Sequence, residues 1–566
     1  MDEILYRIIK GRVSSRHLEK IIGKSLYSGI VNYQQYSSDI EIDFAELLLR
    51  TLDRNAIFNG LFQEFLIYNV LNESQIAELS KIVNIVCDDD FISRKRILEK
   101  SKKRIGQALI NLLLLSIDKY AYNDSVDSVV VEEVLICPDP SRFLSLHDYQ
   151  KRIKDEIIKN LIEIPDSRML VHMPTGSGKT KTCIEAVVDF IRTRPFEEGF
   201  VIWFAHSNEL CMQAYSNLID IWKVKGDSPL PVFKMFGDND ALEDILHFKK
   251  AVLFVGFQKF VSLQRSSKEN HIKIRTHLST NTQLVIIDEA HKSLAETYKS
   301  AINYVSTMPN CRVIGLTATP GRSSDINDPS NTILSDFFKN KLIGVTDSNG
   351  CYLPNSLEYL QKHKFLAKID HKPIEVDLSN FSEEELKKIS ISGELEQSHI
   401  DKIVESPLRN KIIVDEIDRA LQDESKNLIL VFACNVNHCI LLQKLLEFQN
   451  ITSEVVLSET PSQLRSKYIS DFKAGNLKVL INFGVLTTGF DAPRLKTLII
   501  ARHTNSMILY SQMIGRALRG PKNGGNEVNH VIDLVDNISS LGNPQFLFTY
   551  WEEFWGKSFR PPHVNA

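Results

Sequence analysis

The stretch RMLVHMPTGSGKTKTCIEAVVDFI, Arg168–Ile191, decides how the chain folds. A short apolar run leads into a loop with two glycines, and a segment with helical spacing of apolar residues follows. This order predicts a strand, a phosphate-binding loop and a helix. Gly176 and Gly178 allow backbone amides to approach phosphate oxygens. Lys179 can reach the β and γ oxygens, and Thr180 can ligate Mg2+ at the positive end of the helix. The stretch therefore predicts a nucleotide site.

Short apolar runs alternate with polar helical stretches from about residue 139 onward. Such alternation is typical of a parallel α/β sheet. A second series of runs follows a polar stretch near 378–405, which indicates two α/β domains in tandem. Residues 1 to 138 show helical spacing almost throughout and predict an all-α domain. We therefore predict an α/β protein with a helical accessory domain at 1–138, α/β domains at 139–375 and 409–545, a helical linker at 376–408 and a C-terminal tail at 546–566.

The composition indicates a globular protein with real cores, because 43% of the 566 residues are hydrophobic and 24% are charged. The net charge is -4, so a nucleic acid would be bound by local basic surface and not by a global positive field. The longest strongly apolar run, Ala108–Ile117, is shorter than the roughly 20 residues that a membrane span needs. The N-terminus does not have the pattern of a secretory signal, so we expect a cytoplasmic protein.

The eight cysteines are scattered, and none forms the closely spaced pairs expected of zinc or redox sites. The tightest grouping is Cys434, His438 and Cys439, which lacks a fourth ligand nearby. We therefore expect reduced thiols that serve packing.

A second motif, LVIIDEAH, places Asp288 and Glu289 directly after an apolar run. In parallel sheets, ligands bind at the carboxyl ends of the strands. We predict that Asp288 holds Mg2+, directly or through water, and that Glu289 polarises the water that attacks the γ-phosphate. A solvated acidic helix start would explain the charges but not their position after four apolar residues.

DEAH at Asp288–His291 and GLTATPGR at Gly315–Arg322 resemble motifs II and III of superfamily 2 helicases and translocases. Further motifs of that family follow in order over residues 140 to 540. They are LHDYQ at Leu146–Gln150 (the adenine-reading Q motif), FAHSNEL at Phe204–Leu210 (Ia), VGFQKF at Val255–Phe260 (Ib), VFACNVNH at Val431–His438 (IV), VLTTGFDAP at Val485–Pro493 (V) and QMIGRALRG at Gln512–Gly520 (VI). The resemblance implies two RecA-like domains that hydrolyse ATP in the cleft between them, with ATP and Mg2+ as cofactors.

The resemblance also implies roles for individual residues. The catalytic residues would be Lys179, Asp288, Glu289, Arg516 and Arg519, with Thr180 and Asp288 as Mg2+ ligands. The ATP-binding residues would be Gln150, Thr175, Gly176, Ser177, Gly178, Lys179, Thr180, Asp491 and Gln512. The DNA-binding residues would be His206, Phe257, Asn435, Thr487 and Thr488, and the residues that couple the two sites would be Thr317 and Thr319. Arg516 and Arg519 are three apart on a predicted helix, so both could face the γ-phosphate.

Several motifs resemble those of restriction-enzyme helicase subunits and RadD-like bacterial helicases more than those of DEAD-box RNA helicases. They are the combination of DEAH with TATPGR, the TTGFDAP form of motif V and Gln512 at the start of motif VI. The resemblance therefore favours DNA over RNA, with a role in anti-phage defence or DNA repair. The residues show no nuclease constellation, so a nuclease or other effector would be a separate subunit. Two alternatives remain open: an RNA helicase, and a nucleotide-gated clamp or signalling ATPase that does not separate strands.

The segment RKRILEKSKKR, Arg94–Arg104, carries seven basic residues and one acid. A solvated helix face explains it, and contact with nucleic-acid phosphates is the alternative. The glycine-rich segment Gly520–Gly525 predicts an exposed turn.

Overall fold

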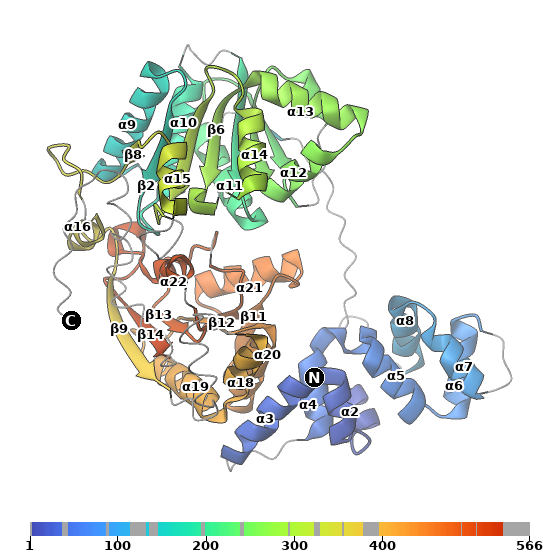
Figure 1. The fold of residues 1–566 in the computed structure, drawn as a ribbon. Helices are drawn as coiled ribbons and strands as arrows, with labels where there is room; N and C mark the ends of the chain where they lie inside the picture. Colours follow the sequence, from blue (N-terminus) through green and yellow to red (C-terminus); the bar gives the residue numbers. More distant parts are fainter. Residues whose placement is uncertain are drawn as a thin grey trace.

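The computed structural model describes residues 3–36, 43–85, 90–113, 132–134, 145–193, 198–237, 243–292, 295–321, 329–353, 356–376, 396–487, 489–504 and 506–535. Figure 1 shows two α/β domains, one above the other, and a helical N-terminal domain beside the lower one. The predicted fold class, two tandem sheet domains behind a helical segment, is confirmed. The expected C-terminal tail lies outside the described residues.

The first α/β domain is built on an eight-stranded sheet in the order β1-β4-β5-β3-β6-β7-β2-β8. Its pairings are parallel except that of β1 with β4 at one edge. The central strands are continuous apolar runs because helices cover both faces. The strands are β1 (Glu132–Val134), β2 (Arg168–His172), β3 (Gly199–Ala205), β4 (Leu230–Met235), β5 (Lys250–Gly256), β6 (Thr282–Asp288), β7 (Arg312–Thr317) and β8 (Leu342–Ile343).

Alternate side chains of these strands enter two separate apolar layers. Val201 and Trp203 of β3 pack with α9, α10 and α11, whereas Phe200 and Phe204 pack with α12, α13, α14 and α15 on the other face. The helices of this domain are α9 (Asp148–Glu163), α10 (Lys179–Ile191), α11 (Asn208–Lys225), η4 (Glu243–His247), α12 (Phe257–Arg265), α13 (Glu269–Asn281), η5 (Ala290–Lys292), α14 (Glu296–Val305), α15 (Pro329–Phe337) and α16 (Ser356–Lys362). The carboxyl ends of the parallel strands therefore meet at one open edge.

Strand β1 differs from the prediction that residues 1–138 are wholly helical. Glu132 lies opposite Val232 of β4, so the first sheet begins before the predicted boundary. The local signal is the sequence VVVEEV at 129–134, since β-branched residues favour strands.

The second α/β domain has six parallel strands in the order β11-β12-β10-β13-β14-β9. They are β9 (Lys368–Glu375), β10 (Ile429–Phe432), β11 (Ser453–Val456), β12 (Val479–Asn482), β13 (Thr497–Ile500) and β14 (Val528–Val535). The helices are α18 (Gln397–Glu405), α19 (Pro407–Leu421), α20 (Val436–Phe448), α21 (Ser462–Ala474), α22 (Met507–Ile514), η6 (Gly515–Ala517) and η7 (Pro521–Asn523). Strand β9 belongs to this sheet, although the first domain was predicted to run to residue 375. An edge strand that contains Pro373 and no apolar run carries little strand signal.

The N-terminal domain consists of short helices around a shared apolar core. They are α1 (Glu3–Ile9), α2 (Ser15–Ile22), α3 (Lys24–Tyr36), α4 (Phe44–Leu52), η1 (Asp53–Phe58), α5 (Gly60–Asn69), α6 (Glu73–Ile82), α7 (Asp90–Leu98) and α8 (Lys102–Leu112). Neither these helices nor the others in the described ranges are long and apolar enough to cross a membrane.

Helix α3 joins the N-terminal domain to the second α/β domain, beside α18, α19 and α20 (Figure 1). The core of the N-terminal helices is continuous with the outer face of the second sheet. A Cβ atom at Gly29 would lie 2.8 Å from Cδ2 of the buried Leu441, so α3 and α20 can approach this closely because residue 29 has no side chain. Gln449 Nε2 also donates to Tyr33 Oη at 3.2 Å. The N-terminal domain is thus attached to the second α/β domain.

The basic segment Arg94–Arg104 contains both structural and exposed charges. The Arg94 guanidinium donates to the main-chain oxygens of Ile67 and Leu71 at the end of α5, where orphan carbonyls need donors. Lys95 and Arg96 are exposed. The phosphate-contact hypothesis therefore concerns the exposed residues and not Arg94.

We expect Gly29→Leu to loosen the junction between the N-terminal and second α/β domains. Overpacking of a buried contact typically costs about 1–3 kcal/mol. Amide hydrogen exchange should become faster in both α3 and α20 while α10 stays protected. Adding Leu441→Ala removes the colliding methyl groups and should restore part of the protection. Unchanged exchange in α20 of the single variant would show that the two helices do not pack as described.

Candidate active site

The phosphate-binding loop connects β2 to α10, as predicted. Gly176 and Gly178 have φ angles of +81° and +86°, a region that glycine adopts without steric cost. Ser177 between them is fully buried, and its hydroxyl donates to Pro174 O at 2.6 Å. Helix α10 begins at Lys179, so its unpaired first-turn amides and positive dipole end lie at the loop. This arrangement suits a bound phosphate.

Helix α9 holds the loop in place from the first domain. Tyr149 Oη and Gln150 Nε2 each donate to Ser177 O at 2.8 Å. Gln150 Oε1 accepts from the His147 backbone N–H at 2.8 Å. The amide nitrogen carries two hydrogens and the amide oxygen two lone pairs, so Gln150 keeps one donor and one acceptor for the predicted contact with adenine.

The acidic pair lies at the carboxyl end of β6, beside the phosphate-binding loop. Asp288 is 3% exposed, and Oδ1 accepts from the Glu289 backbone N–H at 3.0 Å. Burial and the Glu289 charge raise the pKa of Asp288 to about 7, against the opposing effect of Lys179. Burial alone would raise the pKa of Glu289, but His291 and Lys179 lower it below its usual value. Glu289 is therefore the carboxylate of the pair that stays ionised.

Glu289 also has a strained backbone, with φ of +51°. A residue with a Cβ rarely adopts this left-handed conformation, which clusters at functional sites. Glu289 and Lys179 line the same cavity.

The Glu289 carboxylate is linked to strand β7 through His291. His291 Nδ1 lies 3.4 Å from Glu289 Oε2 and 3.1 Å from Thr317 Oγ1. Thr317 Oγ1 in turn donates to Thr319 O at 2.7 Å and accepts from the Thr319 N–H at 3.0 Å. The two threonines predicted to couple the sites are thus in contact with the DEAH segment. Arg322 of the same motif lies outside the described residues.

Two arginines of the second domain reach the same place. Arg519 binds both carboxylate oxygens of Asp491, at 2.9 and 2.7 Å, and donates to Gly176 O of the first domain at 3.0 Å. Arg516 donates to Gln512 O at 3.3 Å and to Phe490 O. Burial lowers the pKa of Arg516, and the Glu289 charge opposes this more than any other group does. Arg516 therefore lies in the field of Glu289, and Arg519 connects the two domains.

Arg516 and Arg519 were predicted to lie on one helix. In the structure they do not. Helix α22 ends at Ile514, Arg516 lies in the 3-10 turn η6, and Arg519 follows in a bridge with Leu366. At Gly515, directly after α22, a Cβ atom would lie 2.4 Å from Thr175 Cβ of the phosphate-binding loop. The two domains can meet at this point only through a glycine.

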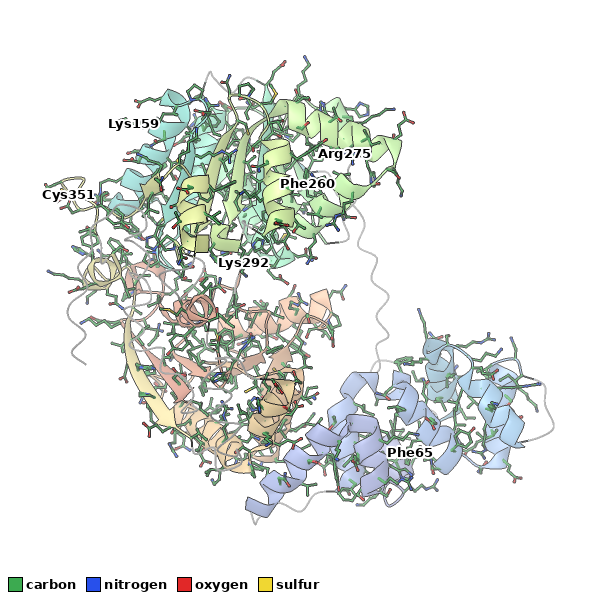
Figure 2. All side chains as sticks on the ribbon, viewed as in Figure 1. Phe65, Lys159, Phe260, Arg275, Lys292 and Cys351 are labelled. Carbon is green, nitrogen blue, oxygen red and sulfur yellow. The ribbon has the colours of Figure 1, made fainter. Side chains whose placement is uncertain are left out.

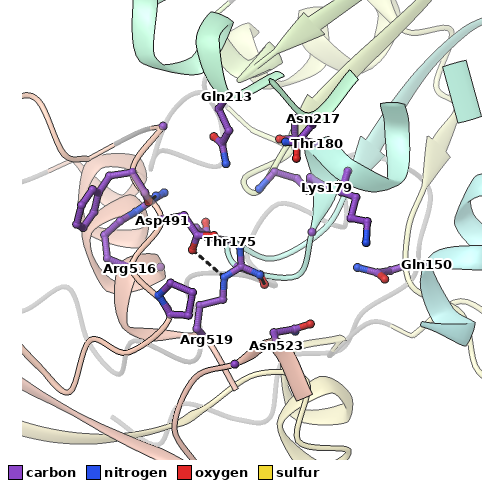
Figure 3. A pocket seen from close by; sticks show the side chains of 18 of the residues that line it. Gln150, Thr175, Lys179, Thr180, Gln213, Asn217, Asp491, Arg516, Arg519 and Asn523 are labelled. Atoms are coloured by element: carbon purple, nitrogen blue, oxygen red, sulfur yellow. Dashed lines mark hydrogen bonds and ion pairs between the residues drawn. The ribbon is translucent and has the colours of Figure 1, made fainter. Parts of the chain in front are cut away.

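These groups line one cavity of about 570 Å3 between the two α/β domains (Figure 3). The predicted residues that line it are Gln150, Thr175, Gly176, Gly178, Lys179, Thr180, Asp288, Glu289, Asp491, Arg516 and Arg519. Ser177 and Gln512 are buried and are not among its lining residues.

Other lining residues were not predicted. Gln213 and Asn217 of α11 are four apart and so share one helix face, a signal that could have been found after motif Ia. The segment expected to form an exposed turn contributes Lys522 and Asn523. Asn523 Oδ1 lies 2.9 Å from His147 Nε2, so this turn joins the second domain to the Q motif.

The acidic pair fits a divalent cation. Asp288 Oδ2 and Glu289 Oε2 are buried and have no hydrogen-bond partner among the described residues. Buried carboxylate oxygens are rarely left unsatisfied, and Mg2+ prefers oxygen ligands. The Thr180 hydroxyl group lies on a lining residue of the same cavity. Thr180 and Asp288 therefore remain suitable Mg2+ ligands.

The residues predicted to bind DNA fall into different environments. His206 and Phe257 follow β3 and β5 at the open edge of the first sheet, but Phe257 is 1% exposed and so supports neighbouring side chains. Asn435 caps α20, where Oδ1 accepts from the His438 N–H at 2.8 Å. Thr487 is buried, and Thr488 lies outside the described residues. Burial leaves little of the Phe257 side chain accessible, and the DNA-binding role of these residues stays a prediction.

The Cys434, His438 and Cys439 group is held by hydrogen bonds. His438 Nδ1 accepts from the Cys434 N–H at 3.1 Å, and Nε2 lies 3.0 Å from Asn410 Oδ1. Both ring nitrogens are engaged, which supports the predicted packing role.

A second contact between the domains lies at the start of α11. Arg465 of α21 forms an ion pair with Glu209 at 2.5 Å and also donates to Ser458 O at 2.8 Å. A Cβ atom at Gly489 would lie 3.0 Å from Glu209 Cβ. The domains therefore meet at Glu209 as well as at Gly515, Arg519 and Asn523.

We expect Gly515→Ala to weaken nucleotide binding by about 5- to 150-fold, the equivalent of an overpacking cost of about 1–3 kcal/mol. The added methyl group collides with the phosphate-binding loop and separates the domains. Binding of a fluorescent ATP analogue would measure the change. Gly256→Ala is the control, because its Cβ atom meets Phe236 at an ordinary 3.5 Å. Equal affinities for wild type and Gly515→Ala would contradict a site shared between two domains.

Each of the two α/β domains matches a different protein family. Residues 143–322 match the family described as type III restriction enzyme, res subunit, and residues 408–521 match the helicase conserved C-terminal domain. A Saccharomyces cerevisiae protein described as an ATP-dependent helicase, IRC3, is 27% identical over 70% of this chain and 52% of its own length. The type I restriction enzyme EcoKI endonuclease subunit of Escherichia coli is 22% identical over 70% of this chain and 35% of its own. The ATP-dependent RNA helicase DBP3 of Candida albicans is 21% identical over 62% and 53%.

The chain therefore spans about half or less of the length of these relatives. Its two matched regions coincide with the two α/β domains, and the cavity between them contains the motif residues of both. The chain belongs to the superfamily 2 helicases and is similar to restriction-enzyme subunits.

Proposed function

We propose that this chain is an ATP-dependent motor that moves along or unwinds nucleic acid, with DNA as its preferred substrate. One observation carries the proposal: Lys179 and Glu289 of the first domain and Arg516 of the second line the same cavity. A γ-phosphate bound there would be surrounded by charges from both domains. Opening or closing the domains would then make or break the hydrolytic site.

Each residue has a distinct part in hydrolysis. Lys179 neutralises the β and γ oxygens, and the ionised Glu289 orients the attacking water and accepts its proton. Arg516 meets the charge that develops on the γ-phosphate, which is worth most in a water-excluded site. Thr180 and Asp288 would hold Mg2+, which would further neutralise the phosphate oxygens.

Domain movement reaches the nucleic-acid edge through two connections. His291 contacts both Glu289 and Thr317, so a displacement of Glu289 at the γ-phosphate would also displace Thr317 of β7. Glu209 lies in the first turn of α11, which follows His206, and forms an ion pair with Arg465 of the second domain. Both connections lie at the carboxyl edge of the first sheet, which supports coupling of hydrolysis to movement of a bound strand.

Similarity to restriction-enzyme subunits supports DNA over RNA, and the relative named as an RNA helicase keeps RNA as the alternative for the test. The same similarity supports a role in anti-phage defence or DNA repair with a separate nuclease or effector subunit. The N-terminal domain, which contains no motor motif, is our candidate for partner or substrate selection.

Variants of the cavity should separate nucleotide binding from hydrolysis. Lys179→Ala should abolish tight ATP binding, because the phosphates lose their cation. Glu289→Gln and Arg516→Ala should retain ATP but slow hydrolysis, by about 10³- to 10⁵-fold for the arginine. Arg519→Ala should stop turnover and also weaken binding, since Arg519 joins the domains.

Single-turnover ATPase and nucleotide-binding assays measure both effects. Arg494 is an exposed arginine of the same domain, and Arg494→Ala is the control. Near wild-type turnover by Arg516→Ala would show that Arg516 has no part in the mechanism.

A substrate panel tests the motor itself. ATPase rates with single-stranded DNA, duplex DNA, forked DNA and RNA should show stimulation that is greatest with DNA. Strand-displacement and triplex-displacement assays on the same substrates distinguish unwinding from translocation on duplex. Greater stimulation by RNA would favour the RNA helicase alternative. Stimulation by DNA without either displacement activity would favour the nucleotide-gated clamp.

A further inference from the structure

Four aromatic rings gather at the carboxyl edge of the first sheet, and none of them lines the nucleotide cavity. Tyr298 of α14 stacks on Phe257, with ring centroids 4.5 Å apart and an interplanar angle of 29°. Tyr298 also stacks with His206, at 5.3 Å and 25°. Phe257 in turn stacks on Phe204 at 4.9 Å and 14°. The rings thus form a column that rises from the core to the half-buried Tyr298.

The column is fixed by its position in the fold. Phe204 belongs to β3, and Phe257 is the first residue after β5, the neighbour of β3 in the sheet. Both phenylalanines are buried and pack in the same apolar layer, and Tyr298 packs against that layer. A ring supported in this way loses little conformational freedom when a ligand covers it, which favours binding.

His206 gives the column a polar side. Both of its ring nitrogens are buried and have no hydrogen-bond partner among the described residues. Burial and the nearby Lys292 and His291 lower the pKa of His206 to about 3, so the ring is neutral at physiological pH. A neutral imidazole has one donor and one acceptor, and neither is paired within the described residues.

A cation lies next to the column. The exposed Lys292 is near enough to affect His206, and its side chain has no ion pair with the described residues. Figure 2 shows Lys292 at the end of the first domain that faces the second domain. Aromatic rings interleaved with cations are the combination that binds single-stranded nucleic acid, in which bases are free to stack.

We propose that Tyr298 is a base-stacking residue, which receives an unpaired nucleobase on a ring supported by Phe257 and flanked by His206. The inference rests on the proposed function and makes it more specific: the bound form is a single strand with exposed bases. A base-paired duplex keeps its bases stacked within the helix and could not use this ring. The nucleobase is shared by DNA and RNA, so the test uses both.

The test measures equilibrium binding of the full-length protein by fluorescence anisotropy. The probes are oligo(dT), oligo(U), an abasic DNA strand of equal length and a blunt DNA duplex. Tyr298→Ala should weaken binding to the base-containing strands by about 5- to 150-fold, the range expected for loss of one stacked base. Its binding to the abasic strand and to the duplex should match wild type, and Tyr298→Phe should bind like wild type throughout.

Tyr304→Ala is the matched control, because Tyr304 lies on the same helix and packs against the same apolar layer. It should leave all four affinities unchanged. Equal loss by Tyr298→Ala on the base-containing and abasic strands, or no loss on either, would overturn the stacking role. Failure of wild type to bind any probe would instead overturn the proposed function. A loss confined to oligo(dT) or to oligo(U) would support stacking and identify the nucleic acid.

A measurement on the wild-type protein does not depend on how the variants fold. A DNA strand with 2-aminopurine at successive positions should lose fluorescence at one position when bound, because stacking on Tyr298 quenches it. The quenching should be absent with Tyr298→Ala. Fluorescence that stays constant at every position on wild type would overturn the proposal.

Discussion

The charged residues that line one cavity between the two α/β domains are the feature on which the rest of the site depends. Lys179, the Asp288–Glu289 pair and Arg516 lie within each other's fields, and burial shifts their pKa values. Charges removed from water are costly unless they have partners. Within the described residues, Lys179 has no ion pair, and Asp288 Oδ2 and Glu289 Oε2 have no hydrogen bond. The cavity is thus prepared for a ligand that supplies both negative phosphates and a divalent cation.

The two α/β domains meet around this cavity through a glycine and two arginines. Gly515 lets the second domain approach Thr175, and Arg519 spans from Asp491 to the Gly176 carbonyl. Arg465 and Glu209 make a further contact between the domains at the start of α11. Because helix α3 packs on α20, the N-terminal domain should follow the second domain whenever the cleft opens or closes. ATP hydrolysis would then move the N-terminal domain relative to the aromatic column of the first domain.

The sequence predicted those parts of the site that depend on local chemistry. The phosphate-binding loop and the acidic pair follow apolar strands, and each position there needs one residue type, so Lys179 and Asp288 could be assigned directly. Features that depend on tertiary packing could not be assigned. Strand β9 has no apolar run, α22 ends at Ile514 before it reaches Arg516, and Tyr298 belongs to no motif. Phe257 has the residue type of a base-stacking side chain, but its burial is a property of the assembled sheet.

The central claim is that Arg516 of the second domain stabilises the transition state on a phosphate held by the first. ADP with aluminium fluoride mimics the transition state of γ-phosphate transfer. Comparing the affinity for this mimic with the affinity for ADP alone tests the claim directly. Wild type should bind the mimic much more tightly than ADP. Arg516→Ala should bind ADP as wild type does and lose most of the additional affinity for the mimic. An undiminished preference for the mimic in Arg516→Ala would contradict the account.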